Sequence, residues 1–215
     1  MADLFVGPGR RIFISAADLD LLAAILEASD PSSRHHRFVQ EGDEIRVGPY
    51  TLETLVVPGH TPGNTMFYIR DRQIMFTGDH ILFDITPNIT HWPSMEDSLG
   101  SYLEQLERVR DIPVRLALPG HRKTGDYRAR IDQILAHHSR RIDNALSIVK
   151  DHPGLCAYEI AGIMKWKIRA ADWDSFPIIQ KWFAVGECLS HLDYLRRRGR
   201  IRFEEKGGIR RYYAV

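Results

Sequence analysis

The 215-residue sequence predicts an α/β fold followed by a small helical module that ends in a hairpin. Two observations lead to this prediction. Short apolar runs alternate with segments of helical periodicity through the first 150 residues, which is typical of helices layered on a sheet. After that point the pattern changes to two helices and two closing strands. We therefore expect two domains, residues 1–150 and 151–215, with the boundary near Pro153-Gly154.

The first half of the sequence is rich in expected strands. A short strand at Arg11–Ile14 is followed by Ser15 and Asp18, which resemble a capping box, and by the helical spacing of Leu19 and Leu26. Glycine, proline and polar turns then separate four further strands. These strands are expected at Glu44–Val47, Tyr50–Val57, Met66–Ile69 and Gln73–Phe76.

Helices dominate the rest of the chain. The larger domain is completed by an amphipathic helix at Leu99–Leu106, a strand at Val114–Leu118 and a long helix at Tyr127–Lys150. Two helices and two strands follow, with a glycine turn between the strands that favours a hairpin. They are expected at Tyr158–Trp166, Ile178–Arg198, Arg200–Glu205 and Ile209–Val215. Helices followed by a terminal hairpin are typical of a winged-helix module.

Composition narrows the classes of function. No apolar run approaches the roughly 20 residues that span a bilayer, so we expect no membrane association. The two cysteines, Cys156 and Cys188, are too few for a disulfide scaffold, and this favours the cytoplasm. The net charge of +1 argues against general nucleic-acid binding. However, arginine is concentrated in Arg196–Arg202 and again at Arg210-Arg211, so nucleic acid stays open as a partner of the C-terminal module.

Three loops share one construction. Each follows a buried strand, contains a glycine, and then presents an imidazole or a carboxylate: His60 after Gly59, Asp79 after Gly78, and His121 after Gly120. Buried strands of one sheet hold their ends in place, and glycine permits the tight turn that directs the next side chain. Imidazole nitrogen and carboxylate oxygen are ligands that zinc prefers. A histidine after glycine can also be an ordinary loop residue, so spacing alone leaves a metal site and three loop residues both open.

The order of these motifs resembles the metallo-β-lactamase superfamily. The resemblance rests on Pro58–Gly63, Gly78–His80 and Pro119–His121, and continues through Ser94–Leu106 and His137–Arg141. It implies part of an αββα sandwich, followed by the winged helix that accompanies some members. It also implies that His60 belongs to a first zinc site, that Asp79 bridges two metals, and that His121 belongs to a second site. Water activated at such metals would hydrolyse a small-molecule substrate.

One motif of the superfamily is missing. Its members supply their other ligands from an earlier His-x-His-x-Asp-His sequence, and the ten histidines here contain no His-x-His. We therefore expect weak metal binding, impaired activity and an incomplete first sheet, which favours association into homo-oligomers. A fragment of a longer gene product is the favoured explanation, with a natural short protein as the alternative.

Three classes of function follow. The leading hypothesis is a metal-dependent hydrolase of esters or thioesters, and a ribonuclease is the competing enzyme. The second class is a non-catalytic winged-helix protein that binds nucleic acid or protein and carries a degenerate hydrolase domain. The third is a truncated product without independent function. Catalytic and substrate-binding residues other than the candidate ligands are not identified by the sequence.

Overall fold

The computed structural model describes residues 13–15, 37–167 and 170–215. In this part of the chain the largest sheet has five strands in the order β3-β4-β5-β6-β7. The strands β3 to β6 pair antiparallel with one another, and β7 runs parallel to β6. Their bounds are Glu44–Val47, Tyr50–Val56, Thr65–Ile69, Ile74–Gly78 and Leu116–Pro119. The predicted α/β class is confirmed.

The predicted bounds of β6 were wrong at both ends. Gln73 has a positive φ of 53° and closes the 3-10 turn η3 (Arg70–Arg72), so it precedes the strand. At the other end the strand continues through Thr77, whose buried hydroxyl donates to the carbonyl of Ile81. A buried polar side chain at a strand end needs such a local acceptor, and hydropathy alone does not indicate one.

A parallel pair of very short strands precedes this sheet. β1 (Phe13–Ser15) overlaps the predicted strand at Arg11–Ile14, and β2 (Arg37–Val39) was not predicted. Three residues are too few to show a periodicity of two. Arg11, Ile12 and the predicted helix at Leu19–Leu26 lie outside the described residues.

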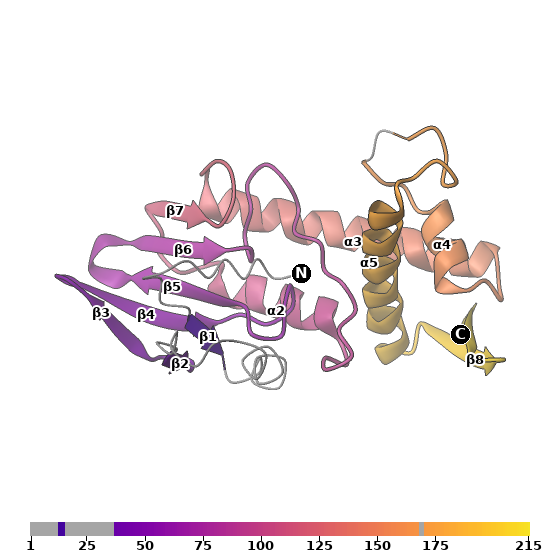
Figure 1. The fold of residues 1–215 in the computed structure, drawn as a ribbon, viewed down its shortest axis with the longest axis horizontal. Helices are drawn as coiled ribbons and strands as arrows, with labels where there is room; N and C mark the ends of the chain where they lie inside the picture. The colour runs from indigo at the N-terminus through magenta and orange to yellow at the C-terminus, as the bar shows by residue number, and fades with distance from the viewer. Residues whose placement is uncertain (1–12, 16–36, 168–169) are drawn as a thin grey trace, which may run out of the picture.

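Two helices cover one face of the large sheet (Figure 1). They are α2 (Ser98–Val109) and α3 (Tyr127–Asp151). Because successive strand side chains alternate between faces, every second residue points toward the helices. The core between these layers includes Leu55, Met66, Tyr68, Met75, Ala117, Leu99, Tyr102, Leu106, Ile131 and Ile134. Large apolar side chains elsewhere on the sheet, such as Phe76, lie exposed.

The C-terminal part has the predicted order of helix, helix and hairpin. Its elements are α4 (Ala157–Ile163), α5 (Ile178–Arg197), β8 (Ile201–Lys206) and β9 (Ile209–Ala214). Gly207 and Gly208 both have positive φ, as the two-residue turn of a hairpin requires. The first helix ends at Ile163 rather than Trp166 because Met164 is extended. No helix in the described ranges has the length and hydropathy to cross a membrane.

The helix α3 connects two separate hydrophobic cores. Ile131 and Ile134 belong to the core under the sheet, whereas Leu146 and Val149 belong to a second core with α4 and α5. Figure 1 shows α5 standing between the sheet layer and the terminal hairpin. The C-terminal part is therefore packed directly against the end of the sheet domain.

Candidate metal centre

The loop after β4 is held against α2 by a glycine. Gly59 has a φ of 141°, and a Cβ atom there would lie 2.4 Å from the Cβ of Tyr102. Only glycine combines this backbone conformation with so close an approach. The loop therefore leaves the sheet along one path, which carries His60 to the edge of the domain.

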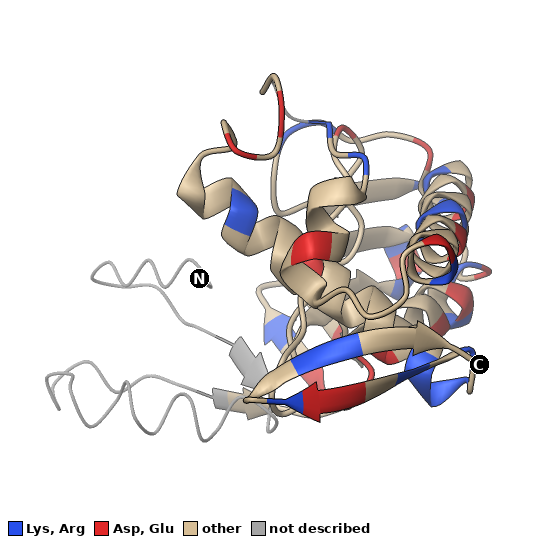
Figure 2. Cartoon of the chain, turned by 90° about the vertical axis from the view of Figure 1, so that its right-hand side faces the viewer, with Lys and Arg blue, Asp and Glu red and all other residues tan. Residues whose placement is uncertain are grey.

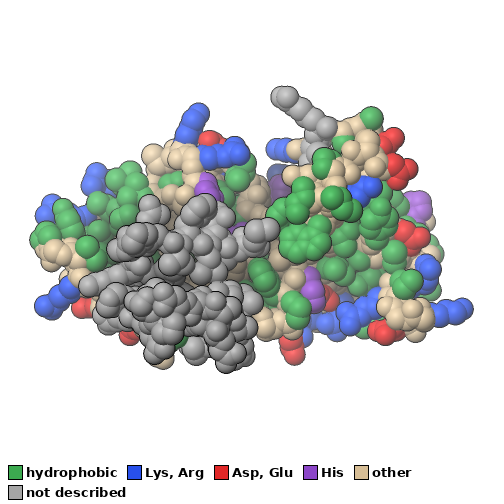
Figure 3. Space-filling view, in the orientation of Figure 1, with side chains coloured by type: hydrophobic (Ala, Val, Ile, Leu, Met, Phe, Trp, Pro, Cys, Tyr) green, Lys and Arg blue, Asp and Glu red, His purple; other side chains and the backbone are tan. Residues whose placement is uncertain are grey.

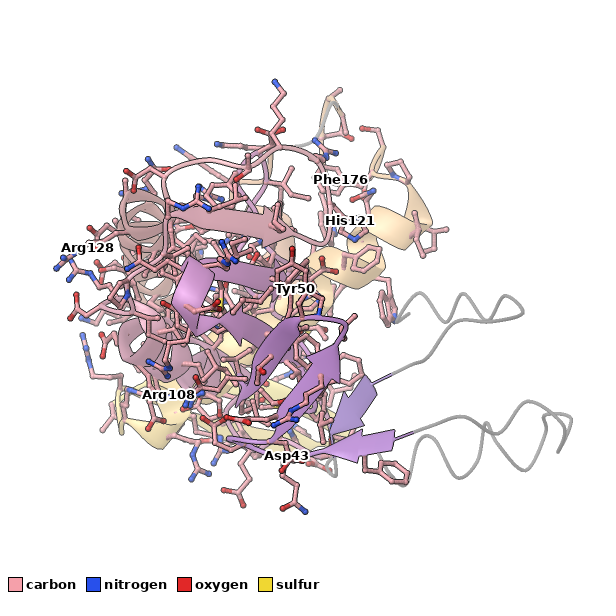
Figure 4. The ribbon with its side chains drawn as sticks, turned by 90° about the vertical axis from the view of Figure 1, so that its left-hand side faces the viewer. Asp43, Tyr50, Arg108, His121, Arg128 and Phe176 are labelled. Carbon is pink, nitrogen blue, oxygen red and sulfur yellow. The ribbon has the colours of Figure 1, made fainter. Side chains whose placement is uncertain are left out.

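The loops after β6 and β7 are tied to each other. The backbone N–H of Gly120 donates to the carbonyl of Gly78 over 2.8 Å. A Cβ at position 120 would lie 2.6 Å from Oδ1 of Asp79, so the glycine makes room for this carboxylate. As a result Asp79 and His121 lie side by side at neighbouring strand ends. Figure 4 labels His121.

The structure brings the three sequence-predicted ligands together around one oxygen atom. Oδ2 of Asp79 lies 3.3 Å from Nε2 of His121 and 3.8 Å from Nε2 of His60. All three side chains are partly exposed, with 26% of His60, 32% of Asp79 and 51% of His121 accessible. The cluster is therefore open to a ligand from solvent.

The orientation of His60 is set by a backbone carbonyl. Nδ1 of His60 lies 2.9 Å from the carbonyl oxygen of Asn88. A carbonyl oxygen only accepts, so Nδ1 carries the proton and Nε2 presents its lone pair toward Asp79. Metal-binding histidines commonly donate their second ring N–H in this way.

The three candidate ligands are of types that bind a divalent ion, and one of the two distances measured from Asp79 suits such an ion. Two ligands of a tetrahedral zinc ion at about 2.0–2.1 Å lie about 3.3–3.4 Å apart. The separation between Asp79 and His121 matches this value, whereas that between His60 and Asp79 is longer. Within the described ranges, no group of three or more His, Cys, Asp or Glu side chains meets the full geometry for holding a metal ion. The distance between His60 and Asp79 would therefore have to shorten to complete the set.

The three side chains line a cavity of about 420 Å³. Its wall comes from the sheet loops, from the segment before α2, and from α5. The lining residues are His60, Thr61, Asn64, Gly78, Asp79, Asn88, Thr90, Trp92, Gly120, His121, Trp182 and Phe183. The C-terminal part of the chain thus contributes directly to the cavity.

A buried polar network connects α5 to His60. Nδ2 of Asn88 donates to Oε2 of Glu187 over 2.8 Å, and Oε1 of Glu187 lies 3.1 Å from Nε of Arg141. Burial raises the pKa of Glu187, which Arg141 and Asn88 oppose by favouring the carboxylate. Sequence reasoning missed both Asn88 and Glu187. They are 99 residues apart, and no local pattern indicates that they meet.

A close contact at Gly186 also joins α5 to the loop before α2. A Cβ on Gly186 would lie 2.2 Å from Oγ1 of Thr90, so the glycine lets α5 touch the loop before α2. The hydroxyl of Ser190 also donates to the carbonyl of Ile89 over 2.5 Å. The loop that orients His60 is therefore packed on α5 rather than free in solvent.

His80 has a structural place, although it directly follows Asp79 in the chain. It is fully buried against Tyr102, whose hydroxyl donates to the His80 carbonyl, and the two rings lie edge to face. Burial lowers the pKa of His80 to about 3. Neither ring nitrogen has a hydrogen-bond partner, and the side chain does not line the cavity.

Two further histidines near these loops do not line the cavity. His138 is fully buried between Tyr102 and His191 and does not reach the cavity. Nδ1 of His91 lies 2.8 Å from Oδ2 of Asp193, so this residue also joins the loop to α5.

The aromatic residues of the C-terminal part divide between its core and the cavity. Trp166 and Trp173 pack against the second core. Trp182 and Phe183 do not, because 58% and 37% of these residues are exposed at the mouth of the cavity. Only the fold shows which helix face each aromatic residue occupies.

The fold is a five-stranded sheet covered by helices on one face, and the loops after three of its strands bring two histidines and an aspartate together. The sequence matches the family model described as the metallo-beta-lactamase superfamily over residues 7–121, more than half of its length. The protein therefore belongs to the metallo-β-lactamase superfamily.

Relatives and solved structures agree with this assignment. The chain resembles a metallo-beta-lactamase family protein from Thermus thermophilus, with a TM-score of 0.76 and 25% identity over 96% of this chain and 72% of that one. It is 22% identical to the Beta-lactamase-like protein 2 homolog of Caenorhabditis elegans, covering 71% of this chain and 51% of that protein. It is 24% identical to an atrochrysone carboxyl ACP thioesterase of Pseudocercospora fijiensis, covering 85% and 53%. The chain spans about half the length of these two curated relatives.

Proposed function

We propose that the protein is a metal-dependent hydrolase of esters or thioesters, and that His60, Asp79 and His121 hold its metal ion. The observation that supports this proposal is the position of one Asp79 oxygen between the Nε2 atoms of two histidines. Membership of the superfamily makes hydrolysis the expected class of reaction. Water would add to the substrate carbonyl, and the C–O or C–S bond would break to give an acid and an alcohol or thiol.

Zinc is the proposed ion because imidazole and carboxylate donors suit it. The chemistry that such an ion supplies is Lewis acidity toward water and toward a carbonyl oxygen. A catalytic zinc site usually has three protein ligands and one open position, so three donors can serve one ion but not two. We therefore propose binding of a single ion, with weak affinity.

Two observations favour carbonyl compounds as substrates: the printed name of one relative, and the residue types that line the cavity. A thioesterase is among the relatives, which supports a thioester as the substrate class. The residues that line the cavity include no lysine or arginine. Phosphodiester substrates are normally positioned by cationic side chains, so a ribonuclease is the weaker alternative.

The ion pairs of the basic C-terminal segment also favour a hydrolase of esters or thioesters over a ribonuclease. Its arginines pair with nearby carboxylates: Arg197 with Glu96 and Arg198 with Asp97, both between segments. Basic and acidic residues also alternate on the terminal hairpin, as Figure 2 shows. Paired arginines are less available to phosphates, so we propose that this surface mainly joins the two parts of the chain.

We also propose that residues 151–215 form a winged-helix module and that residues 1–150 form the hydrolase domain. The two separate cores support this division. A cytoplasmic location is proposed on the two cysteines, which are both free.

Metal titration and hydrolysis together test the function. We expect isothermal titration with ZnCl₂ to show one ion bound per chain with a Kd weaker than about 1 µM, because the three side chains do not have the full geometry for holding an ion. Hydrolysis of 4-nitrophenyl acetate should rise as the zinc concentration approaches saturation. Both signals should be lost in Asp79→Ala, since this residue lies between the two histidines.

The control is Asp84→Ala, which removes an exposed carboxylate outside the cavity lining. It should leave zinc binding and hydrolysis unchanged. Zinc binding that is identical in wild type and Asp79→Ala would contradict the metal site. Zinc binding without hydrolysis of any ester or thioester would contradict the hydrolase while leaving the metal site in place.

A further inference from the structure

One face of α5 exposes four large apolar side chains near its first turns. Ile178, Ile179, Trp182 and Phe183 are 83%, 50%, 58% and 37% exposed. Residues three and four positions apart in a helix lie on one surface, and 178/182, 179/182 and 179/183 are spaced in this way, so the four form a continuous strip, which we call the α5 stripe. Contiguous exposed apolar surfaces in soluble proteins commonly mark binding sites.

The α5 stripe is not required for the core of the C-terminal part. The opposite face of the helix packs there through Ala184, Cys188, Leu192 and Leu195, which are all almost completely buried. Figure 3 shows hydrophobic side chains gathered over the region of α5. The helix would keep its packing without the stripe, so another role has to explain the exposed side chains.

The stripe runs directly into the candidate active-site cavity. Trp182 and Phe183 line the cavity together with the three candidate metal ligands, and their rings meet edge to face at 5.1 Å. Trp92 contributes a third aromatic ring, and its Nε1 already donates to the carbonyl of His60 over 2.9 Å. With its polar atom occupied, this ring presents mainly apolar surface to the cavity.

The charges of the residues that line the cavity restrict which substrate groups can bind beside the α5 stripe. Apart from Asp79 and the histidines, its lining residues are uncharged, and none is basic. An anionic group would therefore find no side-chain counter-charge there. An uncharged apolar chain would instead gain from removing the exposed rings from water.

We propose that the α5 stripe binds the acyl chain of the substrate, so that the enzyme prefers uncharged esters or thioesters of medium-chain acids. This proposal rests on the hydrolase function proposed above. The carbonyl would lie at the ligand cluster, and the chain would extend past Phe183 and Trp182 toward Ile178. From Phe183 to Ile178 the helix advances roughly 7–8 Å, which gives room for several methylene groups.

A chain-length series tests the proposal on the full chain in saturating ZnCl₂. The substrates are the 4-nitrophenyl esters of acetate, butanoate, hexanoate and octanoate. We expect kcat/KM of the wild type to rise about three- to fourfold for each added methylene, as for transfer of a methylene out of water. In Trp182→Ala the rise should fall below about twofold per methylene.

The matched control is Tyr158→Ala. Tyr158 is an aromatic residue of α4 with 47% exposure that does not line the cavity. This variant should keep the wild-type dependence on chain length. An identical dependence in wild type and Trp182→Ala would overturn the acyl site.

A ligand that cannot be hydrolysed separates this proposal from the hydrolase itself. Octan-2-one should bind wild type at least about tenfold more tightly than butan-2-one, and Trp182→Ala should remove the difference. That result, in a protein that hydrolyses no ester, would keep the acyl site and refute the hydrolase. Equal binding of the two ketones would overturn the acyl site. So would a wild-type dimer that dissociates in Trp182→Ala, because a second copy would then cover the stripe.

Discussion

The carbonyl oxygen of Asn88 lies 2.9 Å from Nδ1 of His60 and thereby sets the direction of the opposite ring nitrogen. The side chain of Asn88 is held in turn by Glu187 on α5. The orientation of a candidate ligand thus depends on a helix of the C-terminal part.

Asn88→Ala should weaken zinc binding about tenfold, because loss of an outer partner of a metal ligand typically costs at least this much. The substitution keeps the backbone carbonyl but removes the donation to Glu187, so the loop and the His60 ring gain freedom. Isothermal titration with ZnCl₂ measures the change in Kd. Asn144→Ala, on α3 and outside the cavity, serves as the control and should bind zinc as wild type does. An unchanged Kd in Asn88→Ala would show that α5 does not position His60.

Two glycines near the site should respond differently to alanine. Gly120→Ala places a methyl group 2.6 Å from Oδ1 of Asp79, a side chain that can move, so zinc affinity should fall while the fold persists. Gly59→Ala meets the backbone of Tyr102 at a positive φ and should lower the free energy of unfolding by about 2 to 4 kcal/mol. Urea unfolding and zinc titration of both variants test the contrast. The same loss of stability in both would contradict it.

Acid should destabilise the protein through buried histidines. Burial lowers the pKa of His191 to about 3 and that of His138 well below its usual value. The unfolded chain binds these protons near pH 6.5, whereas the folded chain does not. The stabilisation is therefore complete above pH 6.5 and is lost as the pH falls toward the folded pKa. Each such histidine should lower the free energy of unfolding by up to about 1.4 kcal/mol per pH unit between pH 6 and 4.

Urea unfolding of wild type and His191→Gln at pH 7, 6 and 5 measures this effect. The variant should show a shallower dependence of stability on pH, whatever its stability at pH 7. Burial also lowers the pKa of His80 and His137, to about 3 and about 4, so part of the slope should remain. An identical slope in the two proteins would mean that His191 accepts a proton in the folded state.

Nucleic acid should bind weakly despite the arginine-rich C-terminus. Because Arg197 and Arg198 pair with Glu96 and Asp97, few free cations remain to release counterions from phosphates. Fluorescence anisotropy with a single-stranded RNA at 50 mM salt should give a Kd weaker than about 100 µM. Glu96→Gln would free one arginine and should strengthen binding. Tight, strongly salt-dependent binding by wild type would favour the ribonuclease alternative instead.

Much of the fold was accessible to sequence reasoning because its signals are local. Period-two strands, the 3.6-residue spacing of α2 and α3, and the Gly207-Gly208 turn depend on neighbouring residues only. The bounds of β6 and α4 were wrong because they depend on a hydrogen bond to Ile81 and on an extended Met164. Short β2 carried no detectable period.

For the candidate site, the sequence by itself determined the three ligand types and their loops, since each is a glycine-bounded turn at the end of a buried strand. Only the tertiary structure decided that one Asp79 oxygen lies between His60 and His121. It also decided that Asn88 and Glu187 meet, and that Trp182 and Phe183 face the cavity rather than a core. The physical reason is that these contacts join residues far apart in the chain. Their formation depends on how α5 packs against the sheet domain, and no local sequence pattern predicts that packing.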